Sequence, residues 1–227
     1  MRLKIHQNLR GDEAYKKAVE SLDAVKIPCA KMRMNSYPHE FSGGMKQRAI
    51  IAMALACNAE ILIADEPTTA LDVTIQAQIM ELLREIKQTR ETSILLITHD
   101  LALVGENADK VYVMYAGRIV EEAYADEIFK MPKHPYTQAL LNSLPSSNKD
   151  KILRTIDGQP PAIQEIITGC RFNPRCEKCI DICKKEIPLY EKVGNNHFSA
   201  CFRNNDFQNA KSLLKKAQEQ ELKLNNL

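Results

Sequence analysis

The sequence predicts an α/β domain with a mostly parallel sheet, followed by a small cysteine-rich extension. Two short apolar runs, 61–64 and 93–97, alternate with segments of helical spacing, a pattern typical of helices packed on a parallel sheet. Apart from Ser93, both runs are continuously apolar, as expected for strands buried on both faces. Five of the seven cysteines fall between residues 170 and 201, which sets the last part of the chain apart.

The composition indicates an ordinary globular protein of the cytosol. Of the 227 residues, 44% are hydrophobic and 26% are charged, and the net charge is +2, so no nucleic-acid partner is predicted. The longest apolar run, 49–57, is too short for a bilayer, which needs about 20 residues. The first residues lack the apolar core of a signal peptide.

Helical spacing covers residues 13–26, and Pro28 ends that segment. After a turn at 37–40, Ser42 is a suitable N-cap for a helix that reaches about Cys57. The first apolar strand, 61–64, follows.

Asp72 caps the next predicted helix, in which apolar side chains recur every three or four residues as far as Ile86. The second strand, 93–97, ends just before His99, and a short helix covers 101–107. We expect residues 110–114 to form a third strand of the sheet.

The third strand is followed by Gly117, which predicts a hairpin turn into a fourth strand over 118–121. Prolines, serines and glycine between 145 and 169 indicate a linker or an extended segment, and residues 207–224 have the spacing of a helix.

Asp65 and Glu66 follow the first strand, and His99 follows the second. In a parallel sheet, chemistry belongs at the carboxyl ends of the strands, where these residues fall. One carboxylate can hold Mg²⁺ through its hydration shell, and the other can orient or deprotonate an attacking water. His99 can contact a terminal phosphate. The alternatives are an exposed acidic turn and a structural histidine.

Ser42, Gly43 and Gly44 begin a helix, where free N–H groups favour phosphate; the alternative is an ordinary helix cap. Asp72 is a cap in either interpretation, with a possible contact to a second subunit. A P-loop cannot be formed, because none of the 8 glycines is followed by lysine.

Cys29 and Cys57 are isolated and are expected to be small buried apolar residues. The five clustered cysteines, in a reducing compartment, predict metal or iron–sulfur ligation before disulfides.

These segments, in this order, resemble the ATP-binding subunit of ATP-binding-cassette (ABC) transporters. Residues 41–48 resemble the signature motif, although the common form has Leu where Phe41 stands and Gln where Met45 stands. Residues 61–66 resemble Walker B, 70–72 the D-loop, and His99 the switch histidine. The resemblance implies ATP and Mg²⁺ as cofactors.

The resemblance also implies a role for each matching residue. Asp65 takes the Mg²⁺ role, Glu66 the general-base role, and His99 the catalytic switch role. The residues expected to contact ATP in trans, on a nucleotide held by an opposing subunit, are Ser42, Gly43, Gly44, Met45, Gln47 and Asp72.

Four segments are similar to the oligopeptide/dipeptide importer branch of this family: 37–45, 134–137, 158–161 and 169–176. In that branch, the positions that resemble ligands of a four-iron four-sulfur cluster are Cys170, Cys176, Cys183 and Cys201. Cys179 is an alternative ligand, a zinc site would use the same residues, and free thiols are a third reading.

The resemblance implies a truncated P-loop NTPase-like domain that lacks the Walker A and Q-loop region. The expected division is a helical subdomain (1–58), the last part of the ATPase core (59–144), the cysteine-rich module (145–206) and a C-terminal tail (207–227).

The function implied is ATP hydrolysis coupled to peptide uptake, with little activity of this chain alone. The implied partners are a second ATPase subunit in a homo- or heterodimer, membrane-embedded permease subunits and, indirectly, a peptide-binding protein. The implied place is the inner face of the cell membrane, peripherally bound. The alternatives are a non-catalytic partner that supplies the signature motif in trans, and an iron–sulfur or zinc module.

Overall fold

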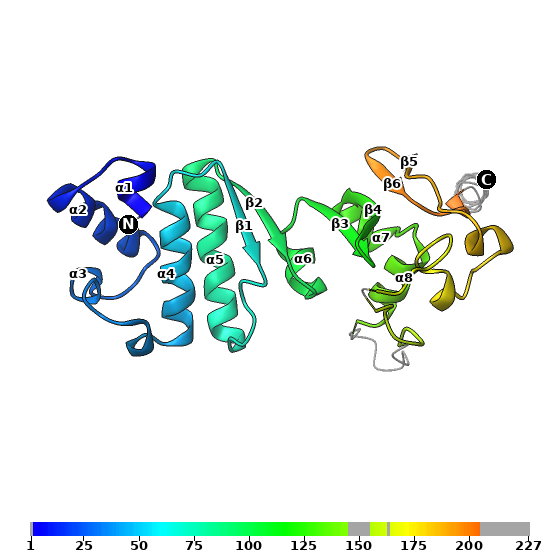
Figure 1. Ribbon diagram of the computed structural model, residues 1–227, viewed down its shortest axis with the longest axis horizontal. Coiled ribbons are helices and arrows are strands. Elements are labelled where there is room, and N and C mark those ends of the chain that lie inside the picture. Colours follow the sequence, from blue (N-terminus) through cyan, green and yellow to red (C-terminus); the bar gives the residue numbers. More distant parts are fainter. Residues whose placement is uncertain (1, 145–154, 163, 205–227) are drawn as a thin grey trace, which may run out of the picture. The chain divides into compact units, whose positions relative to one another are not determined.

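The computed structural model describes residues 2–144, 155–162 and 164–204. The chain divides into two compact units, Met1–Asp100 and Leu101–Leu227, which we describe separately (Figure 1). Two predicted segments lie outside the described residues: the helix over 207–224, and residues 145–154 of the linker. The four-part division expected from the sequence stays a prediction.

The first unit contains five helices and one pair of strands among its described residues. As predicted, Ser42 and Asp72 are the N-caps of the two helices that begin at Gly43 and Val73. The helices are α1 (Arg2–His6), α2 (Gly11–Ala24), α3 (Ala30–Arg33), α4 (Gly43–Leu55) and α5 (Val73–Arg90), with a 3-10 turn η1 (Pro38–Glu40) before α4.

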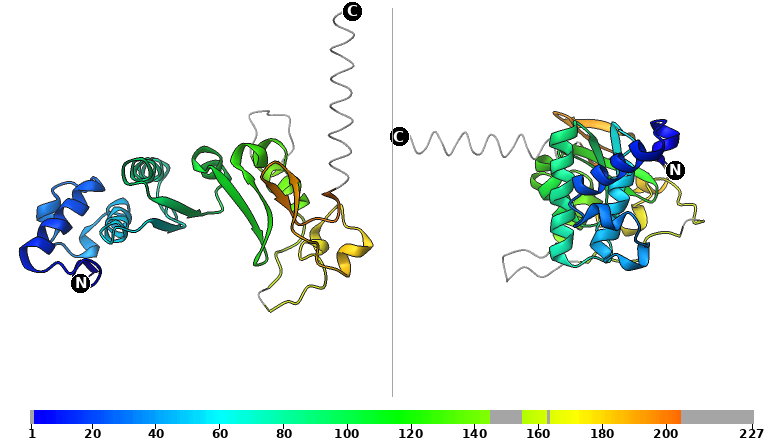
Figure 2. Two further views of the ribbon diagram at one scale, coloured as in Figure 1. Left: turned by 90° about the horizontal axis from the view of Figure 1, so that it is seen from above. Right: turned by 90° about the vertical axis from the view of Figure 1, so that its left-hand side faces the viewer.

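Strands β1 (Ile61–Asp65) and β2 (Ser93–Ile97) pair in parallel, and Asp65 lies opposite Ile97 at their carboxyl ends. Helix α5 lies on one face of this pair (Figure 2). Leu62 and Ala64, on alternate positions of β1, are buried.

The expectation that these strands are covered on both faces is wrong for the described structure. On the other face, the side chains of Ile61 and Ile63 are 63% exposed, and those of Leu95 and Ile97 are 48% and 46% exposed. A continuous apolar run shows that both faces of a strand suit burial, but it does not show what covers each face.

The second unit is built on a four-stranded sheet with the order β3-β4-β6-β5, in which every neighbouring pair is antiparallel. Its strands are β3 (Lys110–Tyr115), β4 (Arg118–Tyr124), β5 (Glu191–Gly194) and β6 (His197–Ser199). Its helices are α6 (Leu101–Asn107), α7 (Ala125–Lys130) and α8 (Pro135–Asn142), with 3-10 turns η2 (Asn173–Arg175) and η3 (Asp181–Lys184).

The predicted third strand therefore exists but is not part of a parallel sheet. Gly117 has a φ of 77° and allows a tight turn that folds β4 back on β3. Strand β6, which precedes Cys201, pairs with β4. The cysteine segment thus shares a sheet with residues that the sequence assigned to the ATPase core. Helices α7 and α8 and the side chain of Phe172 complete the hydrophobic core of this unit.

No helix in the described part of the chain is both long enough and apolar enough to cross a membrane.

Candidate functional site

The pairing of β1 with β2 brings together two of the predicted catalytic residues. Nδ1 of His99 lies 2.7 Å from Oε1 of Glu66, although 33 residues separate them in the sequence. The Thr69 hydroxyl donates a 2.9 Å hydrogen bond to Oε2 of Glu66. Both carboxylate oxygens of Glu66 therefore have a fixed partner, which orients the carboxylate.

The two groups change each other's proton affinity. The hydrogen bond to His99 lowers the pKa of Glu66, and the hydrogen bond from Thr69 lowers it further. The hydrogen bond to Glu66, with its negative charge, raises the pKa of His99. The pair therefore favours an ionised carboxylate beside a protonated or hydrogen-bonded imidazole.

The backbone at Glu66 extends the hydrogen bonding between β1 and β2 by one residue and then turns sharply. Its N–H donates to the Ile97 carbonyl at 2.9 Å, but its φ is 46°, in the left-handed region that non-glycine residues rarely adopt. Asp65, the last residue of β1, precedes it. Strained backbone of this kind is found preferentially at functional sites.

The first turn of α4 contains the predicted phosphate-contacting residues. Ser42 Oγ accepts a 3.3 Å hydrogen bond from the Met45 N–H, which is an ordinary N-cap. A Cβ on Gly43 would lie 3.3 Å from Leu71 Cδ2, and one on Gly44 would lie 2.6 Å from Ile75 Cγ2. The two glycines therefore let α4 approach the start of α5 closely.

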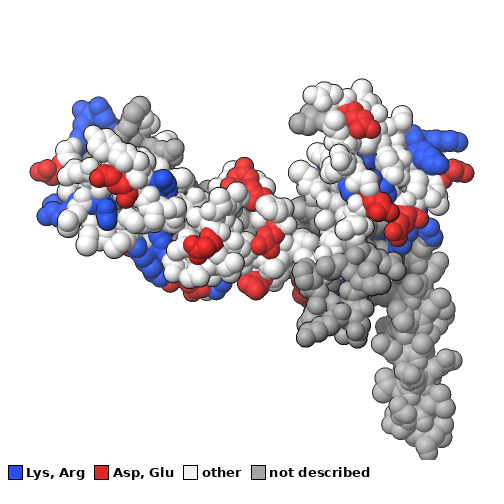
Figure 3. Space-filling model, turned by 90° about the horizontal axis from the view of Figure 1, so that it is seen from below, with Lys and Arg blue, Asp and Glu red and all other residues white. Residues whose placement is uncertain are grey.

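The remaining predicted residues lie on the same two helices. Asp72 Oδ1 accepts a 2.9 Å hydrogen bond from the Ile75 N–H, as a cap does. Gln47 lies in the second turn of α4. Figure 1 shows that the N-terminal ends of α4 and α5 and the carboxyl end of β1 lie at one end of the first unit. In the view from below, the surface over α5 and the β1–β2 pair carries several acidic side chains (Figure 3).

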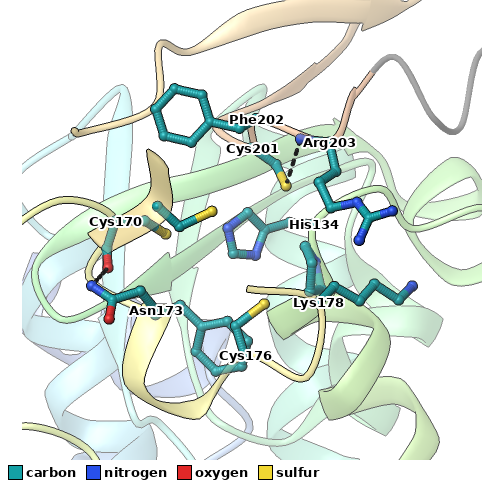
Figure 4. A pocket seen from close by; sticks show the side chains of 11 residues that line it. His134, Cys170, Asn173, Cys176, Lys178, Cys201, Phe202 and Arg203 are labelled. Carbon is teal, nitrogen blue, oxygen red and sulfur yellow. Dashed lines mark hydrogen bonds between the residues drawn. The ribbon is translucent and has the colours of Figure 1, made fainter. Parts of the chain in front are cut away.

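Four of the five cysteines of the second unit gather around one small pocket of about 10 Å³ (Figure 4). Four thiols line it, and the His134 imidazole lies among them. Cys179 does not line it. The four are the residues predicted as cluster ligands, namely Cys170, Cys176, Cys183 and Cys201.

The pocket depends on a close approach of two backbone segments. The Cys170 N–H donates to the Cys183 carbonyl at 2.8 Å. Gly169 has a φ of 74°, and a Cβ there would lie 2.3 Å from the same carbonyl oxygen. Glycine is therefore required at this position, because any side chain would separate the two segments.

Burial favours the neutral form of three of these thiols, those of Cys170, Cys176 and Cys201. Burial raises the pKa of Cys176 and that of Cys201 to about 11, and neighbouring thiols add to the effect. Burial also raises the pKa of Cys170. Among the described residues, no three or more Cys, His, Asp or Glu side chains are spaced as a set of metal ligands. The donor chemistry fits a soft metal or an iron–sulfur cluster, whose binding would release protons from these thiols.

A buried polar network beside this pocket was not predicted. Glu121 is fully buried, and its carboxylate accepts hydrogen bonds from the backbone N–H groups of Lys133 (2.5 Å) and His134 (2.9 Å). Nε2 of His197, on β6, lies 2.7 Å from Oε1 of Glu121. The sequence gives no signal for this network beyond a glutamate inside an apolar strand.

Two family models match the chain. The model described as "ABC transporter" matches residues 1–69, and the model described as "Oligopeptide/dipeptide transporter, C-terminal region" matches residues 120–183.

Curated relatives with similar sequences are also named as ATP-binding proteins of peptide transport. The chain is 48% identical over 209 residues to the probable peptide ABC transporter ATP-binding protein y4tR of Sinorhizobium fredii, covering 91% of this chain and 62% of the relative. It is 50% identical over 202 residues to the oligopeptide transport ATP-binding protein OppD of Escherichia coli (88% and 60%). It is 48% identical over 200 residues to the dipeptide transport ATP-binding protein DppD of E. coli (88% and 61%). The chain thus spans about 60% of the length of these relatives.

Among solved structures, CbiO1 of Clostridium perfringens, part of the ABC transporter complex CbiONQ, matches with a TM-score of 0.50 and 32% identity, covering 56% of this chain and 49% of that one. A putative metal-chelate type ABC transporter in an inward-facing conformation matches with a TM-score of 0.51 and 23% identity, covering 60% and 51%; this likeness concerns the fold alone. Over 88–91% of its length, the chain is thus similar to ATP-binding subunits of ABC transporters of the oligopeptide/dipeptide type.

Proposed function

We propose that this chain is an ATP-binding subunit of an ABC peptide importer and that it couples ATP hydrolysis to peptide uptake. The observation that carries the proposal is the 2.7 Å contact between Glu66 and His99 at the carboxyl ends of two parallel strands. The names of the relatives, which describe peptide, oligopeptide and dipeptide transport, support peptides as cargo.

In this proposal Asp65 holds Mg²⁺ through water, and Glu66 accepts a proton from the water that attacks the terminal phosphate. His99 orients Glu66 and contacts that phosphate. The lowered pKa of Glu66 keeps it ionised at neutral pH, so it is ready to accept a proton. The contact with Thr69 restricts the carboxylate to one orientation.

The nucleotide itself must be gripped by a P-loop, and the sequence of this chain contains none. We therefore place the P-loop outside residues 1–227. The N-terminus of α4, with Ser42, Gly43 and Gly44, then faces a nucleotide bound by an opposing subunit. The further partners are membrane permease subunits, which place the chain at the cytoplasmic side of the membrane.

The test of the catalytic role uses the chain together with a separately produced P-loop segment from a peptide-transport relative. We expect Mg²⁺-dependent ATP hydrolysis that falls by about 100-fold or more in Glu66→Gln, the usual range for loss of a general base. Glu66→Gln retains the size of the side chain. A rate that is equal in the wild type and in Glu66→Gln would contradict the role of Glu66.

The alternative function is a non-catalytic partner that supplies only α4 in trans. The packing of α4 against α5 through Gly43 and Gly44 favours this alternative. These contacts hold the start of α4 in place and do not involve Glu66 or His99. Here the chain is mixed with an intact ATP-binding subunit. Gly43→Asp would then abolish the added activity, whereas Glu66→Gln would leave it unchanged. The opposite pattern would support the catalytic role.

For the second unit, we propose that the pocket lined by four cysteines holds a four-iron four-sulfur cluster. Four sulfur donors around one pocket match the ligand number of such clusters. Iron and acid-labile sulfide analysis of an anaerobic preparation, with visible absorption spectra, tests this. Zinc in the same preparation would instead indicate a structural zinc site, and a metal-free, colourless protein would indicate free thiols.

A matched pair of variants identifies the ligands. Cys176→Ser removes a thiol that lines the pocket, whereas Cys179→Ser removes one that does not. We expect iron content to be lost in the first variant and kept in the second. Loss of iron in Cys179→Ser alone would assign Cys179 as a ligand instead of a pocket cysteine.

A further inference from the structure

The imidazole of His134 lies in the wall of the cysteine pocket, and the residue is packed tightly in the second unit. The side chain is 1% exposed. Its own backbone N–H donates to Glu121 Oε2 at 2.9 Å, and its ring lies 6.0 Å from that of Phe172, centroid to centroid. The position of the ring is therefore determined by the fold of the second unit and not by solvent.

The hydrogen-bonding pattern decides which ring nitrogen carries the proton. His134 is the N-cap of α8, and its Nδ1 accepts a 3.1 Å hydrogen bond from the Tyr136 N–H. An acceptor nitrogen has no hydrogen, so the neutral ring carries its hydrogen on Nε2. A donor N–H is thus present on the far side of the ring from the helix.

That far side belongs to the pocket. His134 lines it together with the four thiols, and Figure 4 shows the ring between the side chains of Cys176 and Cys201. A metal-site sulfur in this pocket would therefore have a fixed N–H donor as a neighbour. The same imidazole therefore caps α8 through Nδ1 and offers an N–H donor through Nε2.

We propose that His134 donates a hydrogen bond from Nε2–H to a sulfur of the iron–sulfur cluster and thereby raises the reduction potential of the cluster. This inference rests on the proposed cluster. A one-electron reduced cluster carries one more negative charge than the oxidised form. A hydrogen bond to sulfur stabilises the more negative form, and such bonds are among the factors that set cluster potentials.

Two substitutions separate the donor from the helix cap. His134→Asn keeps an acceptor at the δ position for the Tyr136 N–H but has no atom at the ε position. His134→Gln reverses this, because it has an amide N–H₂ at the ε position and no acceptor at the δ position. His39→Asn, at an exposed position of the first unit, is the control for a histidine distant from the pocket in sequence.

The anaerobic 227-residue chain is titrated with dithionite and followed by electron paramagnetic resonance, with iron and sulfide determined on each sample. We expect His134→Asn to reduce the ratio of reduced to oxidised cluster about tenfold at the wild-type midpoint, which for one electron is about 59 mV. His134→Gln should recover most of this loss, and His39→Asn should equal the wild type.

A loaded His134→Asn with the wild-type midpoint overturns the role of His134 and leaves the cluster intact. Absence of iron and sulfide from the wild type overturns the cluster itself. If the variants do not bind a cluster, a measurement on the wild type still tests the proposed hydrogen bond. With ¹⁵N-histidine labelling, pulsed paramagnetic resonance of the reduced cluster detects a histidine nitrogen coupling if the hydrogen bond exists, and the lack of that coupling overturns the proposal.

Discussion

Oε1 of Glu66 and Nδ1 of His99 lie 2.7 Å apart, and each residue directly follows or closely follows one of two paired parallel strands. This contact lowers the pKa of Glu66 from its ordinary value of 4.5 and raises that of His99 from 6.5. Between these two shifted values, both groups are charged and attract each other.

The pair predicts a defined pH dependence. The stabilisation from His99 is fully present below pH 6.5 and is lost as pH rises through its raised pKa. The stabilisation from Glu66 is fully present above pH 4.5 and is lost as pH falls through its lowered pKa. An NMR titration should find the His99 pKa above 6.5 in the wild type and closer to 6.5 in Glu66→Gln. An identical His99 pKa in both proteins would show that the contact does not exist in solution.

Gly44→Ala should destabilise the first unit. The added methyl group would lie 2.6 Å from Ile75 Cγ2, so α4 and α5 must separate. We expect a net loss of about 1–2 kcal/mol, because overpacking costs about 1–3 kcal/mol and the better helix propensity of alanine returns up to about 1 kcal/mol. Urea unfolding measures it.

Two further variants control the Gly44 result. Gly43→Ala places its methyl group 3.3 Å from a flexible end of Leu71 and should cost less. Combining Gly44→Ala with Ile75→Ala, which removes the clashing methyl group, should cost less than the sum of the single substitutions. Strict additivity would contradict the proposed contact.

Gly169→Ala should damage the cysteine pocket. The backbone at this residue is left-handed, and a Cβ would overlap the Cys183 carbonyl oxygen. The left-handed conformation alone costs a non-glycine residue about 1–2 kcal/mol, so the unfolding temperature of the second unit should fall. We also expect less bound iron after reconstitution. Gly158→Ala, whose Cβ would have ordinary contacts to Arg175, should keep its iron.

Glu121→Ala should be among the most destabilising substitutions in the second unit. It removes the acceptor of two buried groups, Nε2 of His197 and the backbone N–H of His134, and of the partly buried backbone N–H of Lys133. Breaking a buried pair in this way costs about 3–5 kcal/mol. Thermal unfolding followed by circular dichroism measures the loss.

Glu121→Gln is the matched control for that substitution. It keeps one acceptor oxygen and the packing, so it should cost less than Glu121→Ala. Equal losses in the two variants would show that packing of the side chain, and not its hydrogen bonds, is what stabilises this region.

Local patterns in the sequence predict the first unit well. Ser42 and Asp72 identify the starts of two helices because an N-cap is a property of three or four neighbouring residues. The contact of Glu66 with His99 follows from two apolar runs that end next to polar residues, since parallel strands align their carboxyl ends. Periodicity alone does not predict the exposed side of Ile63, because it does not identify the neighbour of a strand.

The second unit is less predictable because its defining contacts link distant segments. Glu121 lies opposite Ser199 in the sheet, and its hydrogen-bond partner His197 is 76 residues away. No local pattern encodes such a pairing. The pocket cysteines could be found from their clustering, whereas the role of His134 becomes visible only when its ring is seen beside them.

Under the proposed mechanism, the left-handed backbone at Glu66 sets thermal robustness against catalytic competence at this residue. Glycine or asparagine would adopt the same φ with less strain, worth about 1 kcal/mol, yet neither can accept a proton as a carboxylate does. A screen that selected variants of this chain for heat resistance alone would weigh this relief of strain against the lost contacts with His99 and Thr69, and any variant it retained at position 66 would lack the proposed general base.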